Sequence, residues 1–139
     1  MVTQSDSAEH SANLALVKAL YAAIAGNKAE SIVSHLSPDF VLTEAEGLPY
    51  GGVYKGPSGF MDLWRKLGDW WQDFRPVDFE YLAGEGSVAV VIQLEGISRK
   101  SGGKFSQKIV ELWKIRGDRI VEGTVFYFDT HAVRQVCAL

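Results

Sequence analysis

The spacing of apolar residues divides the chain into a helical first half and a strand-rich second half. Apolar positions three or four apart predict a first helix ending at Gly26: they are Leu14, Val17, Leu20, Tyr21 and Ile24. A second, shorter helix is expected over 27–36, because Pro38 prevents it from continuing. A third helix begins at Pro57 and ends before Arg75–Pro76; its apolar face holds Phe60, Leu63, Trp64, Leu67 and Trp71.

Alternating apolar and polar residues predict strands in the remainder of the chain. One strand, over 40–44, lies between the second and third helices and precedes a glycine-rich loop over 47–52. The others cover 77–81, 87–98, 104–116 and 119–128, with Gly117–Asp118 as a two-residue hairpin turn. A last short helix is expected over 130–136.

This order predicts an α+β protein in which three N-terminal helices pack on a strongly curved, mostly antiparallel sheet. A sheet closed on one side by helices leaves a concave pocket for a small molecule. With 139 residues and no internal repeat or linker, we expect residues 1–139 to form a single domain.

Composition removes several classes of function. The net charge of −3 offers no basic face for a phosphate backbone, so nucleic acid is not an expected partner. The longest apolar run, 88–92, is too short to cross a membrane. Cys137 is the single cysteine, which makes a reducing, cytoplasmic location the simplest expectation. No metal-ligand spacing occurs, and we expect no metal or other cofactor.

Glu111 is the first candidate for chemistry. It alternates with Ile109 and Trp113 on one strand face. If that face lines the pocket, desolvation would raise the pKa of Glu111 and keep it a neutral acid that donates a hydrogen bond. The alternative is a partner cation or burial of the opposite face.

Glu44 is the second candidate, at the end of the first strand. It would act as a general base there. Glu46 lies two positions on, so either carboxylate could point inward, and a solvated strand end is the plain alternative.

Asp129 and several aromatic residues complete the candidate site. Asp129 could join Tyr127 at the end of the pocket, although a cap for the last helix is its simplest role. Packing in the core is the plain alternative for the aromatic residues. The candidates for binding a flat or cyclic apolar ligand are Tyr50, Tyr54, Trp64, Trp113 and Tyr127.

The order of several short segments resembles the nuclear transport factor 2-like superfamily, which includes ketosteroid isomerases, SnoaL-like polyketide cyclases and limonene epoxide hydrolases. The segments are 23–27 (AIAGN), 36–40 (LSPDF), 54–57 (YKGP), 112–121 (LWKIRGDRIV) and 127–129 (YFD). The resemblance covers residues 9–136 and implies a cystatin-like cone.

The resemblance to ketosteroid isomerases assigns roles to three positions. Glu44 matches the isomerase's base, and Glu111 matches its protonated acid on a late strand. The isomerase's helical tyrosine falls at Ala19 here, and Tyr21 is a rotation of about 200° away on the helix. Tyr21 is therefore not expected to replace it.

Two functions follow. One is a cofactor-independent acid–base enzyme, an isomerase, cyclase or dehydratase acting on an apolar cyclic carbonyl compound, with Glu44 as base and Glu111 as acid. The other is a non-catalytic module that binds a small apolar ligand or a protein partner. The outer sheet face carries Val110, Leu112 and Phe126, so we also expect a homodimer through that face.

Overall fold

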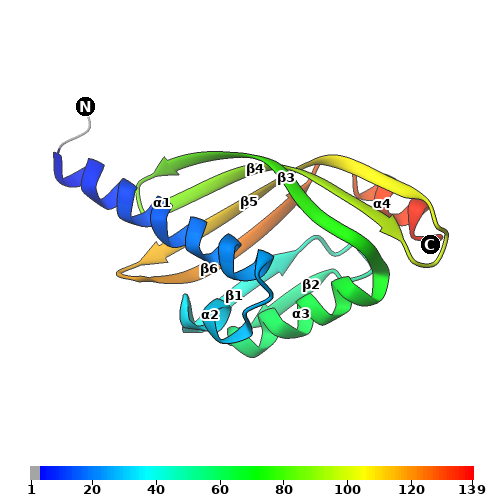
Figure 1. Cartoon of the computed structure of the whole chain (residues 1–139), viewed down its shortest axis with the longest axis horizontal. Helices are drawn as coiled ribbons and strands as arrows, with labels where there is room; N and C mark the ends of the chain where they lie inside the picture. Colours follow the sequence, from blue (N-terminus) through cyan, green and yellow to red (C-terminus); the bar gives the residue numbers. More distant parts are fainter. Residues whose placement is uncertain (1–3) are drawn as a thin grey trace.

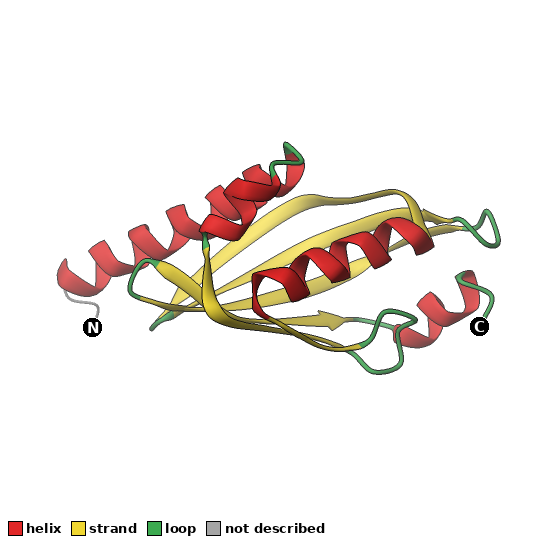
Figure 2. Cartoon of the chain, turned by 90° about the horizontal axis from the view of Figure 1, so that it is seen from below, coloured by secondary structure: helices red, strands yellow, loops and turns green. Residues whose placement is uncertain are grey.

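The computed structural model describes residues 4–139, and it places helices on one side of a mixed sheet (Figures 1 and 2). The helices are α1 (Gln4–Ala25), α2 (Ala29–Ser34), α3 (Gly56–Trp70) and α4 (Thr130–Val136). The strands are β1 (Leu36–Glu44), β2 (Gly52–Lys55), β3 (Trp71–Gly84), β4 (Ser87–Ser98), β5 (Lys104–Arg116) and β6 (Arg119–Tyr127). The α+β class and the short C-terminal helix are confirmed.

The sheet has the strand order β2-β1-β6-β5-β4-β3. Strands β3 to β6 form an antiparallel meander, and β1 pairs in parallel with β6. Alternate residues of β4, among them Val88, Val90, Ile92 and Leu94, are buried beneath the helices. Helices α1 and α3 lie along this face (Figure 2) and close the core over it.

The expectation of a strongly curved sheet was wrong, because the sheet is not strongly curled. The register of the edge strand β3 against β4 shifts twice, between Gln72 and Arg75 and again between Val77 and Glu80. Single shifts also occur in the β1–β6 and β5–β6 pairs. Such bulges bend a strand locally and increase its twist there.

Several segment boundaries also differ from the sequence-based expectation. Strand β1 already begins at Leu36, which was expected in the second helix, and β3 begins at Trp71 instead of Val77. The third helix ends at Trp70, and Trp71 is extended, with φ −121° and ψ 144°, because it already pairs with Ser98 of β4. Strand β2 was not expected. It has only four residues, begins at Gly52 with φ 120°, and lies at the edge of the sheet beside β1.

Candidate functional site

Three neighbouring strands bring the inward-facing candidates into rows across the sheet. In the first row, Leu42 of β1 pairs with Gly123 of β6, which pairs with Trp113 of β5. A Cβ atom on Gly123 would lie 2.6 Å from Cζ3 of Trp113. Glycine at this position therefore leaves the room in which the indole ring packs flat against the sheet.

The second row holds both carboxyl groups. Val125 of β6 pairs with Glu111, and Glu44 comes level with Val125 because the preceding residue, Thr43, pairs with Thr124. Glu44 and Glu111 thus face the same side with one strand between them, their Cα atoms roughly 10 Å apart by two inter-strand spacings. Glu44 is 4% exposed, whereas Glu46 is exposed, so Glu44 is the carboxyl group that points inward.

Tyr21 of α1 completes the site at Glu111. The indole N–H of Trp113 donates to the Tyr21 hydroxyl at 2.8 Å, and that hydroxyl donates to Oε1 of Glu111 at 2.7 Å. An indole N–H can only donate, so the tyrosine hydrogen is directed to the carboxyl group. Tyr21 was not expected to replace the isomerase's tyrosine, yet its hydroxyl group contacts the carboxyl group of Glu111.

The error lay in the position matched along the helix. Tyr21 shares its helix face with Val17, Leu20 and Ile24, all directed toward the sheet, whereas Ala19 lies off that face. Positions 19 and 21 do point in nearly opposite directions on the helix, and Tyr21 is the one that faces the site.

A second hydrogen-bonded chain ends at Tyr127. The indole N–H of Trp71 donates to the Tyr50 hydroxyl at 3.2 Å, and the Tyr50 and Tyr127 hydroxyl oxygens are 2.8 Å apart. If Tyr50 donates to Tyr127, the remaining hydrogen belongs to Tyr127, which lines the cavity. The opposite direction would leave a hydrogen without an acceptor on Tyr50, which is 1% exposed. Because buried donors are normally satisfied, the first arrangement is favoured.

These residues surround a cavity of about 300 Å³ between α1, α3 and the sheet. Glu44, Glu111, Tyr21 and Tyr127 supply its ionisable groups. Among the described residues, the lining includes no lysine, arginine or histidine. Apolar and aromatic side chains form most of the wall; they include Phe60, Leu63, Trp64, Trp71, Phe74, Ile92, Leu94, Ile109, Trp113 and Val125.

The two carboxyl groups have different surroundings. Burial raises the pKa of Glu44 well above its ordinary value, and the negative charge of Glu111 raises it further. Oε2 of Glu44 has no hydrogen-bond partner among the described residues. Burial also raises the pKa of Glu111, but the hydrogen bond from Tyr21 opposes that rise. Glu111 keeps some access to the cavity although it lies deep in the protein.

Replacing Glu44 by glutamine is expected to make stability less dependent on pH. A buried acid with a raised pKa stabilises the folded state fully at low pH, and that contribution falls as pH rises from the ordinary value of 4.5 toward the folded pKa. Each unit of pKa difference corresponds to about 1.4 kcal/mol. Thermal unfolding from pH 5 to pH 9 should therefore favour the variant progressively at high pH. Exposed Glu46→Gln is the control, and an equal slope in both variants would contradict the burial of Glu44.

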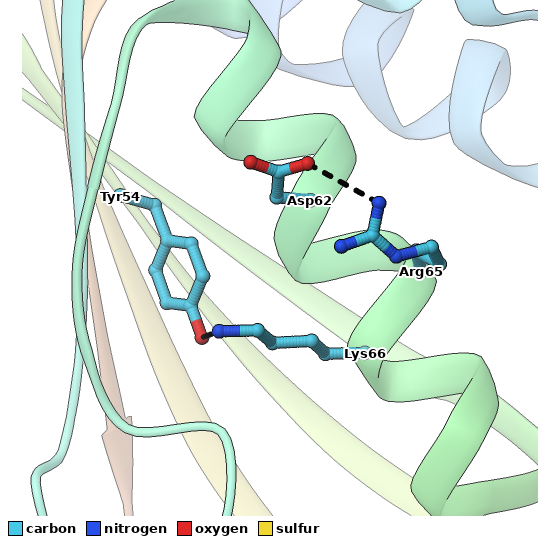
Figure 3. A network of polar contacts seen from close by, with 4 residues as sticks. All are labelled: Tyr54, Asp62, Arg65 and Lys66. Carbon is cyan, nitrogen blue, oxygen red and sulfur yellow. Dashed lines mark hydrogen bonds and ion pairs between the residues drawn. The ribbon is translucent and has the colours of Figure 1, made fainter.

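Five of the expected site residues line the cavity: Glu44, Trp64, Glu111, Trp113 and Tyr127. Tyr50 is not part of the lining, and its hydroxyl group contacts that of Tyr127. Tyr54 does not line the cavity: its hydroxyl donates to the Tyr50 carbonyl at 2.7 Å and lies 3.5 Å from Nζ of Lys66. Figure 3 shows Tyr54 directed toward Lys66 on α3, beside the Asp62–Arg65 ion pair.

Asp129 also lies outside the cavity. It is exposed, and its carboxylate accepts a hydrogen bond at 3.1 Å from the backbone N–H of Ala132 in the first turn of α4. This is the helix-capping role. Sequence reasoning missed Tyr21 as part of the site and did not choose Trp71 among its binding residues. Within residues 4–139, no group of three or more potential ligand side chains is placed to hold a metal ion. No described helix is long and apolar enough to span a membrane.

Comparison with known proteins supports this fold. A family model described as a SnoaL-like domain matches residues 17–123. No curated protein matches the chain. A solved NTF2-like protein from Burkholderia thailandensis superposes with a TM-score of 0.80 at 24% identity, covering 87% of this chain and 93% of that one.

Two further structures were solved with small molecules bound. TerC, co-crystallised with polyporic acid, has a TM-score of 0.82 at 21% identity and covers 92% of this chain and 99% of its own. A protein with a ketosteroid isomerase-like fold from Catenulispora acidiphila, in complex with trimethylamine, has a TM-score of 0.74 at 14% identity. The matched regions cover 89% of this chain and 92% of that one. At these identities the likeness establishes the fold alone.

Proposed function

This chain belongs to the SnoaL-like domain family, and on that basis we propose that it is a cofactor-independent acid–base enzyme acting on an apolar cyclic carbonyl compound. Isomerisation, cyclisation and dehydration of such a compound all require a proton to leave one atom and another to be donated nearby. The observation that carries the proposal is the pair Glu44 and Glu111, which share one row of the cavity but have different surroundings.

The surroundings favour Glu111 as the base and Glu44 as the neutral acid, the reverse of the roles expected from the sequence. The Tyr21 hydroxyl donates to Glu111, which stabilises the ionised carboxylate. No described residue donates a hydrogen bond to Oε2 of Glu44, which would ionise beside the charge of Glu111, so Glu44 retains its proton to higher pH. A pair of acids with pKa values pushed apart is the arrangement that separates the two roles.

Tyr127 supports the same reaction as a second donor. Its hydroxyl hydrogen is directed to the cavity when Tyr50 donates to it, and the pKa of Tyr127 is raised well above its ordinary value by burial. It therefore stays protonated. Glu44 and Tyr127 would together donate to the carbonyl oxygen as negative charge develops on it, while Glu111 removes the proton from the adjacent carbon.

The test is proton exchange at the carbon beside a ketone, measured by NMR in D₂O with 2-tetralone as the probe. The rate should rise with pH as the pair loses its first proton, mainly from Glu111, and fall as it loses the second, mainly from Glu44. The midpoints of the rising and falling parts of the pH–rate profile should both lie above the ordinary pKa range of a carboxyl group. Glu44→Gln should remove the falling limb. Exchange no faster than in buffer would contradict the proposal for this class of ketone.

A non-catalytic binding module is the second candidate, favoured by the largely apolar wall of the cavity. TerC and the trimethylamine complex are structural neighbours crystallised with small molecules. Saturable binding of 2-tetralone, seen by ligand-observed NMR without any exchange of its protons, would support this reading over the enzyme.

The outer sheet face is proposed to pair with a second copy of the chain. Val91, Val110 and Phe126 form one apolar row there, and Phe126 is 53% exposed. Exposed apolar surface of this kind usually marks an interface. Light scattering at high micromolar concentration should give the mass of a dimer, and Phe126→Glu should give a monomer. A monodisperse wild-type monomer would rule the pairing out.

A further inference from the structure

Within residues 4–139, the lining of the cavity holds two carboxyl groups and no basic side chain. Glu44 is 4% exposed, its Oε2 atom has no partner among the described residues, and Glu111 lies on the same face with strand β6 between them. We propose that this cavity binds a small organic cation, a protonated amine or a quaternary ammonium carried on an apolar ring, with Glu44 and Glu111 as its counter-ions.

The unpartnered carboxyl oxygen is the first support. Burying a carboxyl group away from water without hydrogen-bond donors is costly, and buried acids are normally paired. In the described residues, no lysine, arginine or histidine lines the cavity, so the partner is not supplied from within the lining. A cationic ligand in the cavity, which Glu44 lines, would supply the opposite charge.

The wall chemistry also suits an ammonium ion attached to a ring. Trp64, Trp113 and Phe74 are among the aromatic residues that line the cavity. Aromatic faces attract cations when water is excluded, and the remaining apolar wall would contact the hydrocarbon part of the same ligand. A neutral ring of equal size would gain only the second of these contacts.

Binding of the cation is coupled to proton release. The ionisable groups that face one another in the cavity are Tyr21 from α1, Glu44 from β1, Glu111 from β5 and Tyr127 from β6, with Tyr50 behind Tyr127. In the empty cavity Glu44 holds a proton because burial and the neighbouring Glu111 disfavour its charge. A bound cation favours that charge, so Glu44 releases its proton as the ligand enters.

This inference goes beyond the proposed reaction because it needs no chemical step. The reaction uses a neutral Glu44 as a donor, whereas the cation requires Glu44 ionised. Ketone exchange without cation binding would therefore overturn the inference and leave the reaction standing. Cation binding without ketone proton exchange would support the inference and contradict the proposed reaction.

The experiment compares cyclohexylammonium with cyclohexanol, a neutral ring of the same size, by isothermal titration calorimetry from pH 6 to pH 9. We expect the cation to bind at least about tenfold more tightly, with an affinity that rises by up to about tenfold per pH unit. Titration in two buffers of different ionisation enthalpy should show release of about one proton per ligand bound.

Variants separate this result from non-specific attraction to an acidic protein. Glu44→Gln should weaken cation binding by about tenfold or more and abolish proton release, and exposed Glu46→Gln should change neither. Glu111→Gln is the second test, with the same expected loss of affinity, should the first variant fold poorly. Equal binding of cyclohexanol, or full cation affinity in both folded cavity variants, would overturn the proposal.

Discussion

Replacing Glu111 by glutamine is expected to lower kcat/KM for ketone proton exchange by roughly 10²- to 10⁴-fold, the usual contribution of a positioned general base. Glutamine has nearly the same shape and can still accept the hydrogen bond from Tyr21 at its amide oxygen. It cannot take up a proton. The loss should appear mainly in kcat, because substrate binding relies on the apolar wall and the donors at Glu44 and Tyr127.

Two matched substitutions make this expectation specific. Glu46→Gln removes a carboxylate that is two residues from Glu44 but exposed, and it should leave exchange unchanged. Glu44→Gln keeps an amide that can donate a hydrogen bond, so it should cost less than Glu111→Gln near neutral pH. A Glu111→Gln enzyme retaining a third or more of wild-type activity, beside an inactive Glu44→Gln enzyme, would restore the role assignment expected from the sequence.

The alternation of apolar and polar residues in the second half of the chain was enough to place the β5 residues of the site on one face. Ile109, Glu111 and Trp113 must share a face, whatever the rest of the fold, because successive residues of a strand point to opposite sides. The pairing of Glu111 with Val125 and the level position of Glu44 depend on register across two further strands. One sequence does not determine that register, which is why Glu44 and Glu46 could not be separated.

Tyr21 was predictable from helical periodicity but was overlooked. Its apolar face-mates Val17, Leu20 and Ile24 already placed it toward the sheet. Trp71 was a different case. It fits the apolar face of the preceding helix equally well, and only its pairing with Ser98 draws it into β3, where its indole N–H reaches Tyr50. Tertiary pairing overrides local pattern at such boundaries.

The fold class followed from element order, whereas the shape of the sheet did not. Helices followed by long hairpins predict one layer of helices on an antiparallel sheet. How far that sheet bends depends on bulges, and the residues at the bulges of β3, Asp73 and Asp78, have positive φ values of 52° and 53°. Aspartate tolerates that conformation but does not require it, so neither bulge could be predicted from the residue types.

Trp113→Ala is expected to lower the free energy of unfolding by about 3–5 kcal/mol, the usual cost of removing a buried aromatic side chain. Trp113 is 2% exposed, its ring stacks on Phe40 at 6.5 Å, and Gly123 leaves the space beneath it. Truncation leaves a cavity that these neighbours cannot fill, because they lie on paired strands. Denaturant titration measures the change directly, and Tm should fall by roughly 10 to 15 °C.

Trp113→Phe separates packing from hydrogen bonding at the same position. It keeps an aromatic ring over Gly123 but removes the N–H that donates to Tyr21, so its stability cost should be only about 1–2 kcal/mol. Without that donor the Tyr21 hydroxyl is no longer fixed toward Glu111, and the rising limb of the exchange profile should move to higher pH. The stability of the Ala variant then measures the packing of Trp113 in the core, and the pH profile of the Phe variant measures its effect on Glu111. A Phe variant as unstable as the Ala variant, with an unshifted profile, would mean that Trp113 only fills space and that Glu111 titrates independently of Tyr21.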